Sequence, residues 1–245
     1  TLANKTKDLI SDHVYVGSYI ALACLTIMPA IFLSFYKNSK ITNKNNSTYS
    51  NVRTYKEFVS DPKFLQAMVA ATFGYVVMAF LMTATPISMH YVHKLSVDKV
   101  GLVIQFHVLG MFLPSLVTGN LIKRFGFSNI MYMGVFFYAL TISLSLFEPT
   151  FINYFASLIF LGIGWNFLYI SGTSLLVTTY NEQEKFKAQG FNDLIVFSAT
   201  AIGSLSAGIL ISLLSWKIVN FMCIPFLIII LFVILRADIK KAPAN

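Results

Sequence analysis

The chain has 245 residues, of which 56% are apolar and 11% are charged, and its formal net charge is +8. A typical soluble domain carries about 25% charged residues, so this composition excludes a protein that is wetted on every side and favours one that lies in a bilayer. The two cysteines, Cys24 and Cys223, both lie inside apolar runs, and they indicate neither a disulfide framework nor a metal site.

Seven stretches contain no Asp, Glu, Lys or Arg, and each reaches the roughly 18 residues that a helix needs to cross a bilayer. In chain order they cover residues 14–36, 64–89, 100–122, 127–147, 149–180, 194–216 and 218–235. The predicted fold class is therefore an all-α, polytopic membrane protein with seven transmembrane helices. The stretch 149–180 is longer than one crossing needs, which predicts a tilted helix that extends past the membrane surface.

The segment 37–63, between the first two spans, is long, polar and rich in Asn, Ser and Lys, which is typical of a linker. Within it, YKEFVSDPKF at 55–64 predicts a short surface helix that ends before Pro62, because the residue before a proline disfavours helical geometry. The predicted organisation is an external segment and first helix at 1–36, a cytoplasmic linker at 37–63, and a six-helix bundle with a short tail at 64–245. The chain begins with Thr1 and lacks a leader pattern, so we expect a fragment of a longer polypeptide.

Lysine and arginine are divided unequally between the two sides that the spans define. Thirteen lie on the side of the linker and the tail: Lys37, Lys40, Lys44, Arg53, Lys56, Lys63, Lys123, Arg124, Lys185, Lys187, Arg236, Lys240 and Lys241. The other side holds Lys5, Lys7, Lys94, Lys99 and Lys217. Short loops rich in these residues face the cytoplasm, so we expect a cytoplasmic C-terminus and a location in the inner membrane. Anionic lipids already suit this charge, and no nucleic-acid partner is expected.

The loop GNLIKRFG at 119–126 lies between two spans and is predicted to be a tight cytoplasmic turn. It resembles a motif of the major facilitator superfamily, Gly-x-Leu-x-Asp-Arg-x-Gly, in the weaker copy that recurs between the eighth and ninth helices. Gly119, Leu121, Arg124 and Gly126 match that copy, whereas Lys123 occupies its acidic position. The stretch EKFKAQGFNDLIVFSATAIGSLSAG at 184–208 also resembles the start of the eleventh helix in this superfamily.

The resemblance implies two six-helix bundles around a central cavity that opens alternately to each side of the membrane. The chain would supply the last helix of the N-terminal bundle and the complete C-terminal bundle. This implies a secondary transporter, or permease, that moves a small organic molecule and works with the missing N-terminal bundle and a coupling ion. The sequence contains no phosphate-binding Walker loop and no nucleophile–base–acid set, so we expect neither ATP-driven transport, nor an enzyme, nor a cofactor.

His107 is the prominent ionisable side chain within the spans, and an imidazole can change charge near neutral pH. Three roles are open for it: a neutral group that is hydrogen-bonded to a neighbouring helix, a contact in the substrate cavity, or a group that couples transport to protons. Gln105 points about 200° away on the helical wheel, so it is the alternative cavity contact on this helix.

A stripe of residues with helical spacing runs along the span 149–180 and comprises Gly162, Trp165, Asn166, Tyr169 and Thr173. Aromatic planes with a few polar groups suit an organic ligand. Trp165, Asn166 and Tyr169 are therefore predicted substrate contacts, with helix packing as the alternative. Such a lining fits a drug-like amphiphile, a vitamin such as a flavin, or a metabolite.

The span 64–89 carries a similar stripe, in which Tyr75 and Met82 are candidate cavity contacts, although methionine is more often part of a core. Pro86 predicts a bend and a hinge near the outer gate. At the start of the span 194–216, Asp193 is predicted to cap the helix or to act as a gate residue, because a helix N-terminus favours a carboxylate.

A seven-helix receptor or photoreceptor is the alternative function, because seven spans are visible. None of the seven predicted spans contains a lysine that could hold retinal. A long linker after the first helix is also unusual in one compact bundle. A membrane enzyme is disfavoured, because the spans hold no acid–base pair. His90 and His93 lie three residues apart without further ligands nearby, so no metal site is expected.

Overall fold

The computed structural model describes Thr6 and residues 16–36 and 52–240. The chain divides into two compact units, Thr1–Ser50 and Asn51–Asn245. In the first unit, helix α2 covers Val16–Ser34, and nearly all of its side chains are exposed. A helix that is apolar on every side is typical of a membrane span.

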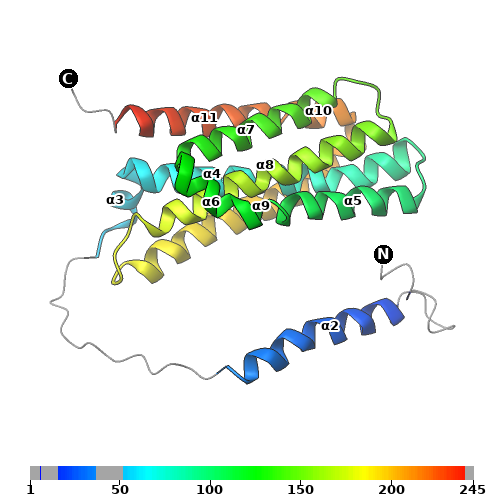
Figure 1. Cartoon of the computed structure of the whole chain (residues 1–245). Coiled ribbons are helices and arrows are strands. Elements are labelled where there is room, and N and C mark those ends of the chain that lie inside the picture. The colour runs from blue at the N-terminus through cyan, green and yellow to red at the C-terminus, as the bar shows by residue number, and fades with distance from the viewer. Residues whose placement is uncertain (1–5, 7–15, 37–51, 241–245) are drawn as a thin grey trace. The chain divides into compact units, whose positions relative to one another are not determined.

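The second unit consists of helices over the residues that the structure describes, and Figure 1 shows its long helices lying alongside one another. The elements are α3 (Tyr55–Ser60), α4 (Pro62–Ile87), the π-helical turn η1 (Ser88–Val92), α5 (Val97–Phe112), α6 (Ser115–Phe125), α7 (Phe127–Leu144), α8 (Phe151–Val177), α9 (Lys185–Leu213), α10 (Trp216–Phe221) and α11 (Ile224–Ile239).

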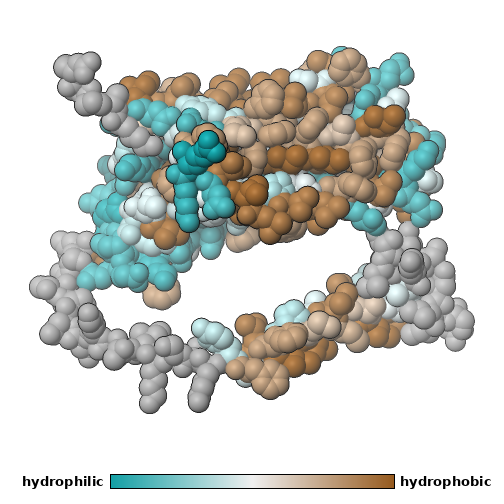
Figure 2. Space-filling view, viewed as in Figure 1, coloured by the Kyte–Doolittle hydropathy of each residue, from teal (hydrophilic) through white to brown (hydrophobic). Residues whose placement is uncertain are grey.

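Seven helical spans in the described part of the chain are long and apolar enough to cross a membrane. They are Val16–Ser34, Pro62–Val92, Val97–Phe125, Phe127–Leu144, Phe151–Val177, Lys185–Leu213 and Trp216–Ile239. This confirms the prediction of an all-α, multi-pass membrane protein. In the second unit, apolar side chains gather along the middle of the bundle and polar side chains at its two ends (Figure 2).

Local sequence fixes where α3 and α4 begin and end. The hydroxyl of Thr54 accepts a hydrogen bond from the backbone N–H of Glu57, whose carboxylate accepts from the Thr54 N–H in return. This capping box starts α3, which ends before Pro62 as predicted. Asp61 then caps α4 by accepting from the Lys63 N–H at 2.9 Å, and Pro62 suits the first turn because it has no N–H to leave unpaired.

The connection between α6 and α7 consists of Gly126 alone, so the predicted tight turn is confirmed. Gly126 has a φ of 85°, a conformation that L side chains rarely adopt and that glycine adopts freely. Arg124, just before the turn, is exposed and places its guanidinium 5.2 Å from the centre of the Phe125 ring. The motif residues therefore build the turn, with the cation at its surface.

Helix α8 is the central element of the bundle, because it packs against α4, α5 and α7. Glycines on three sides of α8 permit this. A Cβ atom added to Gly162 would lie 2.5 Å from the carbonyl oxygen of His107 in α5, and one added to Gly172 would lie 2.8 Å from that of Ala67 in α4. Gly164 faces α7 equally closely. Small residues let membrane helices approach until their backbones touch, and α8 uses this on three neighbours at once.

The end of the linker is fixed to the loop between α8 and α9 by Arg53. Its guanidinium donates to both carboxylate oxygens of Glu184, at 2.8 and 2.9 Å, and to the carbonyl oxygen of Thr179 at 2.5 Å. Lys187 adds a hydrogen bond from Nζ to the Arg53 carbonyl oxygen at 2.6 Å. Asp61 accepts a longer bond of 3.4 Å from the same guanidinium. We call this set of contacts the Arg53 clasp.

The clasp changes the acid–base behaviour of its members. The hydrogen bond from the Arg53 side chain, which outweighs the effect of burial, lowers the pKa of Glu184 from 4.5 to about 2. The same bond raises the pKa of Arg53. A carboxyl with a lowered pKa stabilises the folded state above its ordinary pKa, and this contribution is lost as the pH falls through the folded-state value. The clasp is thus complete at neutral pH.

We predict that Gly162→Ala lowers the apparent melting temperature of the protein, because α5 must move away from the new methyl group, and overpacking of this kind costs about 1–3 kcal/mol. Gly208→Ala is the matched control, since nothing lies within 4 Å of the added Cβ. The measurement is the fraction that stays monodisperse in size-exclusion chromatography after heating. Equal melting temperatures for the two variants would contradict the close packing of α5 and α8.

We also predict that acid releases α3. Protection of the α3 amides, which compares the observed exchange rate with that of an unfolded peptide at the same pH, should fall between about pH 4.5 and 2 in the unmodified protein, as Glu184 is protonated. Glu184→Gln should show fast exchange already at pH 6, because a neutral amide cannot replace the ion pair. Glu182→Gln removes an exposed acid from the same loop and should behave like the unmodified protein. Slow exchange of the α3 amides in Glu184→Gln at pH 6 would contradict this prediction.

Candidate functional site

Three aromatic side chains from α4 and α8 form a compact cluster near the middle of the bundle. The rings of Trp165 and Tyr169 are stacked, with centroids 5.0 Å apart and an interplanar angle of 12°. They lie four residues apart, so helical geometry places them on one face of α8. Tyr75 of α4 presents its ring edge-on to both, at 5.6 and 5.2 Å.

Two further rings extend the cluster onto neighbouring helices. Phe112 of α5 lies 6.0 Å from Trp165, and Phe197 of α9 lies 6.1 Å from Tyr75. Phe112 and Phe197 are 59% and 54% exposed, so the cluster is open on one side. We call Tyr75, Phe112, Trp165, Tyr169 and Phe197 the aromatic face. Tyr75, Trp165 and Tyr169 were predicted from the sequence, and the structure brings them together.

Polar groups accompany the rings. The indole N–H of Trp165 is buried and has no acceptor among the described residues. Asp193 of α9 is exposed one turn before Phe197. Stacking surfaces beside a donor and a carboxylate form a site that can hold and orient an aromatic ligand.

The placement of Asp193 corrects part of its prediction. Helix α9 begins at Lys185, and its N-cap residue is Glu184, so Asp193 lies more than two turns inside the helix and does not cap it. The predicted span starts at residue 194, but the helix begins at Lys185, because no proline or glycine pair interrupts the charged residues before the apolar stretch. A gate role for Asp193 stays a prediction.

Asn166 lies apart from the aromatic face, although it follows Trp165 directly. Its side chain is fully buried, and its amide donates to the carbonyl oxygen of Met111 at 2.7 Å and to the hydroxyl of Ser115 at 2.5 Å. The hydroxyl of Thr118 donates to its Oδ1 at 2.6 Å. These partners flank the break between α5 and α6, where Pro114 cannot supply a backbone N–H. Asn166 therefore satisfies the backbone at this break.

His107 is also fully buried, between α5 and α8, and its Nδ1 lies 2.7 Å from the carbonyl oxygen of Leu158. A carbonyl only accepts, so Nδ1 carries the proton of this bond. This geometry matches the first of the three predicted roles, a hydrogen bond to a neighbouring helix. Gln105, on the opposite side of α5, is exposed. Neither residue contributes a ring contact to the aromatic face.

Met82 and Pro86, the other candidates on α4, lie about two and three turns further along this helix than Tyr75. Met82 is half-buried and packs against the core. Pro86 lies inside α4, and the helix continues into the π-helical turn η1 two residues later. Such turns mark local irregularity in a helix and are frequent at functional sites. The hydroxyl of Thr83 lies 3.0 Å from that of Ser204 in α9, so this part of α4 is joined to α9.

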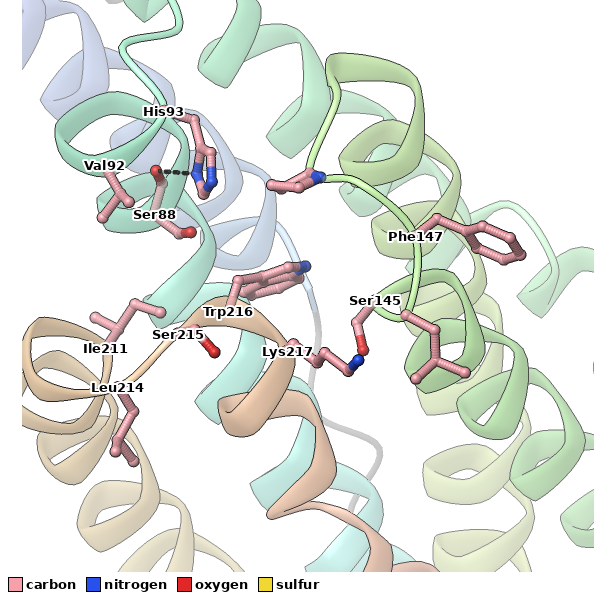
Figure 3. Close-up of a pocket in the computed structure, with 12 residues that line it drawn as sticks. Ser88, Val92, His93, Ser145, Phe147, Ile211, Leu214, Ser215, Trp216 and Lys217 are labelled. Atoms are coloured by element: carbon pink, nitrogen blue, oxygen red, sulfur yellow. Dashed lines mark hydrogen bonds between the residues drawn. The ribbon is translucent and has the colours of Figure 1, made fainter.

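A separate pocket of about 230 Å³ lies at the end of the bundle that carries η1. Figure 3 shows Trp216 and Lys217 on one wall and His93 on another. The hydroxyl of Tyr154 lies 2.6 Å from the Ser88 hydroxyl and 3.1 Å from Nδ1 of His93, which ties α8 to η1. No group of three or more metal-binding side chains occurs in the described ranges.

Sequence reasoning missed two members of the aromatic face and the Arg53 clasp. Phe112 and Phe197 come from helices other than those with the aromatic stripes, and nothing in their local sequence marks them. Arg53 and Glu184 lie 131 residues apart. The charged residues of the segment 181–193 were the sequence signal for the clasp, because a carboxylate that becomes buried, as Glu184 does, needs a cationic partner.

A family model described as Major Facilitator Superfamily matches residues 67–245. Riboflavin transporter RfnT of Brucella anthropi is 36% identical over 241 residues, which cover 98% of this chain and 60% of that protein. The uncharacterized transporter YdeG of Bacillus subtilis, described as of the same superfamily type, is 36% identical over 139 residues, 56% of this chain and 32% of that protein. The chain thus spans less than two thirds of either relative.

We predict that Asn166→Ala lowers the yield of folded protein and its apparent melting temperature, because the carbonyl of Met111 and the hydroxyls of Ser115 and Thr118 lose a partner. Polar groups left unpaired inside a membrane bundle cost about 1–2 kcal/mol in total. Asn129→Ala is the control, since that amide donates to a single carbonyl at the exposed end of α6. An Asn166→Ala protein as stable as the control would show that the α5–α6 break needs no such support.

Proposed function

This chain belongs to the major facilitator superfamily, and we propose that it forms the C-terminal part of a secondary transporter for a planar aromatic compound of the flavin type. The aromatic face carries this proposal. It offers stacked and edge-on rings from four helices and is open on one side. Aromatic pairs gain roughly 0.5–1.5 kcal/mol beyond their buried area, enough to hold a ligand without trapping it.

The chemistry of a flavin fits this face. Its fused ring system is planar and can insert beside Trp165 and Tyr169, while its edge carries carbonyl oxygens and ring nitrogens. The unpaired indole N–H of Trp165 is a donor for such an oxygen. The similarity to a riboflavin transporter over 98% of this chain supports the same substrate class. A planar aromatic drug would use the same contacts and is distinguished by competition.

The open side of the aromatic face needs a second wall. We propose that an N-terminal bundle supplies it, with α2 as the last helix of that bundle and 37–63 as the link between the bundles. Alternating access then follows from rocking one bundle against the other around the ligand. The excess of Lys and Arg on the side of the Arg53 clasp supports the proposal that this side and the C-terminus face the cytoplasm and that the protein lies in the inner membrane.

The driving ion is part of this proposal. Asp193 is an exposed carboxylate one turn before Phe197 of the aromatic face, so we propose it as a gate residue whose charge changes the affinity of the aromatic face.

A seven-helix receptor is not favoured, because the family model and the relatives are those of transporters.

The test is uptake of labelled riboflavin by bacterial cells that lack their own riboflavin uptake and express the full-length protein from its native gene. Tyr169→Ala and Trp165→Ala should each lower uptake about tenfold, since each removes a stacking partner worth about 1 kcal/mol or more, whereas Trp165→Phe should retain much of it. Phe232→Ala, which removes an exposed ring from α11 far along the chain from the aromatic face, is the control.

Two outcomes count against the proposal in different ways. Full uptake by both alanine variants at normal protein levels would show that the aromatic face is not the substrate site. Absence of riboflavin uptake by the unmodified protein would show that the substrate is another compound, and competition between planar aromatics in a binding assay would then identify the class.

A further inference from the structure

A second pocket lies between the start of α4 and the end of α11. It has a volume of about 290 Å³ and is lined by Val59, Ser60, Pro62, Leu65, Val233, Arg236, Ala237 and Lys240. In Figure 1 the end of α11 lies at the same end of the bundle as α3. The lining is apolar on the α4 side, and two cations on α11 face it. We call it the α4–α11 pocket.

The two cations of the pocket are not neutralised within the described bundle. The side chains of Arg236 and Lys240 form no ion pair, hydrogen bond or ring contact with the residues that the structure describes. They lie four residues apart, so both project from the same face of α11. Two exposed cations beside an apolar lining attract an anion that has an apolar part.

The acids nearby have partners other than Arg236 and Lys240. Asp61 accepts from Arg53 and caps α4, and Glu57 accepts from Thr54 in the capping box of α3. Asp238 accepts from the hydroxyls of Ser128 and Tyr132 of α7, at 2.7 and 3.1 Å. The donor groups of Arg236 and Lys240 therefore stay available to an anion from outside the protein.

The depth of the pocket relative to the bilayer follows from α11 itself. Ile228, Phe232, Leu235 and Ile239 are all exposed apolar side chains, and their spacing places them along one side of this helix. Such a surface belongs in the hydrocarbon region. Lys240 follows the last of these residues, and Arg236 lies in the last turn of α11, from which its long side chain can reach the phosphate groups at the membrane surface.

We propose that the α4–α11 pocket binds the phosphate group of an anionic phospholipid, with Arg236 and Lys240 as its ligands and the acyl chains along the apolar side of α11. Basic pockets between membrane helices favour such headgroups. The pocket is separate from the aromatic face, because Leu65 precedes Tyr75 by ten residues, about 15 Å of helix. Arg236 can grip the phosphate with two N–H groups, whereas Lys240 adds a point charge.

The experiment uses the full-length protein in mild detergent, titrated with phosphatidylglycerol and, in parallel, with phosphatidylcholine, and bound lipid is counted by native mass spectrometry. Phosphatidylglycerol should bind preferentially. The pair of changes Arg236→Gln and Lys240→Gln should weaken the tightest binding about 25-fold, since each basic side chain near the surface changes binding by roughly a factor of five. The exchange Arg236→Lys with Lys240→Arg keeps both charges and should retain most of the affinity.

A matched control removes two exposed cations from the end of α6, through Lys123→Gln and Arg124→Gln, and should leave the tightest binding within about twofold. Equal losses in both double variants would show diffuse attraction to the surface and overturn the site. So would equal binding of the two lipids. Displacement of phosphatidylglycerol by inorganic phosphate alone would assign the pocket to a soluble anion. Should the Arg236→Gln, Lys240→Gln double variant fail to fold, Lys240→Gln alone is tested instead. It should weaken the tightest binding of phosphatidylglycerol about fivefold, and unchanged binding would overturn the site.

Discussion

The contact of α8 with three neighbouring helices through glycine is the constraint on which this structure depends. Lipid tails are as apolar as leucine, so helices in a bilayer gain little from burying apolar surface against one another. Close packing and hydrogen bonds must hold them together instead. At Gly162 and Gly172 the backbones of α5 and α4 approach α8 so closely that no Cβ would fit without movement. The positions of α4, α5 and α7 are thus set by one helix.

This packing also decides which side chains of α8 form the aromatic face. Trp165 and Tyr169 stack on each other and contact Tyr75 of α4, in a cluster whose outer rings, Phe112 and Phe197, are exposed. Asn166, about 100° further round the helix, projects into the bundle and satisfies the α5–α6 break. Neighbouring residues on one helix therefore divide into the rings of the aromatic face and a buried amide that supports a break in another helix.

The sequence predicted the helices well because charge is costly inside a bilayer, so gaps in the charge mark the spans. It predicted the turn at Gly126 because a motif with fixed glycine spacing encodes local geometry. It could not assign Asn166 or His107, because a helical wheel ranks faces by polarity and cannot tell an amide that faces a cavity from one that faces a broken helix. Phe112 and Phe197 required tertiary structure, because each belongs to the aromatic face only through rings on other helices.

The two ends of the bundle are tied in chemically different ways, and this bears on the proposed transport cycle. At one end the Arg53 clasp joins the linker to the α8–α9 loop through charge. At the other, the hydroxyls of Ser88 and Tyr154 and the ring of His93 join η1 to α8 through hydrogen bonds. The clasp pairs a guanidinium with a buried carboxylate, so it depends on the charge of Glu184, whereas the contacts at η1 contain no carboxylate. In the proposed transport cycle, loss of that charge would therefore release one end of the bundle and leave the contacts at the other end in place.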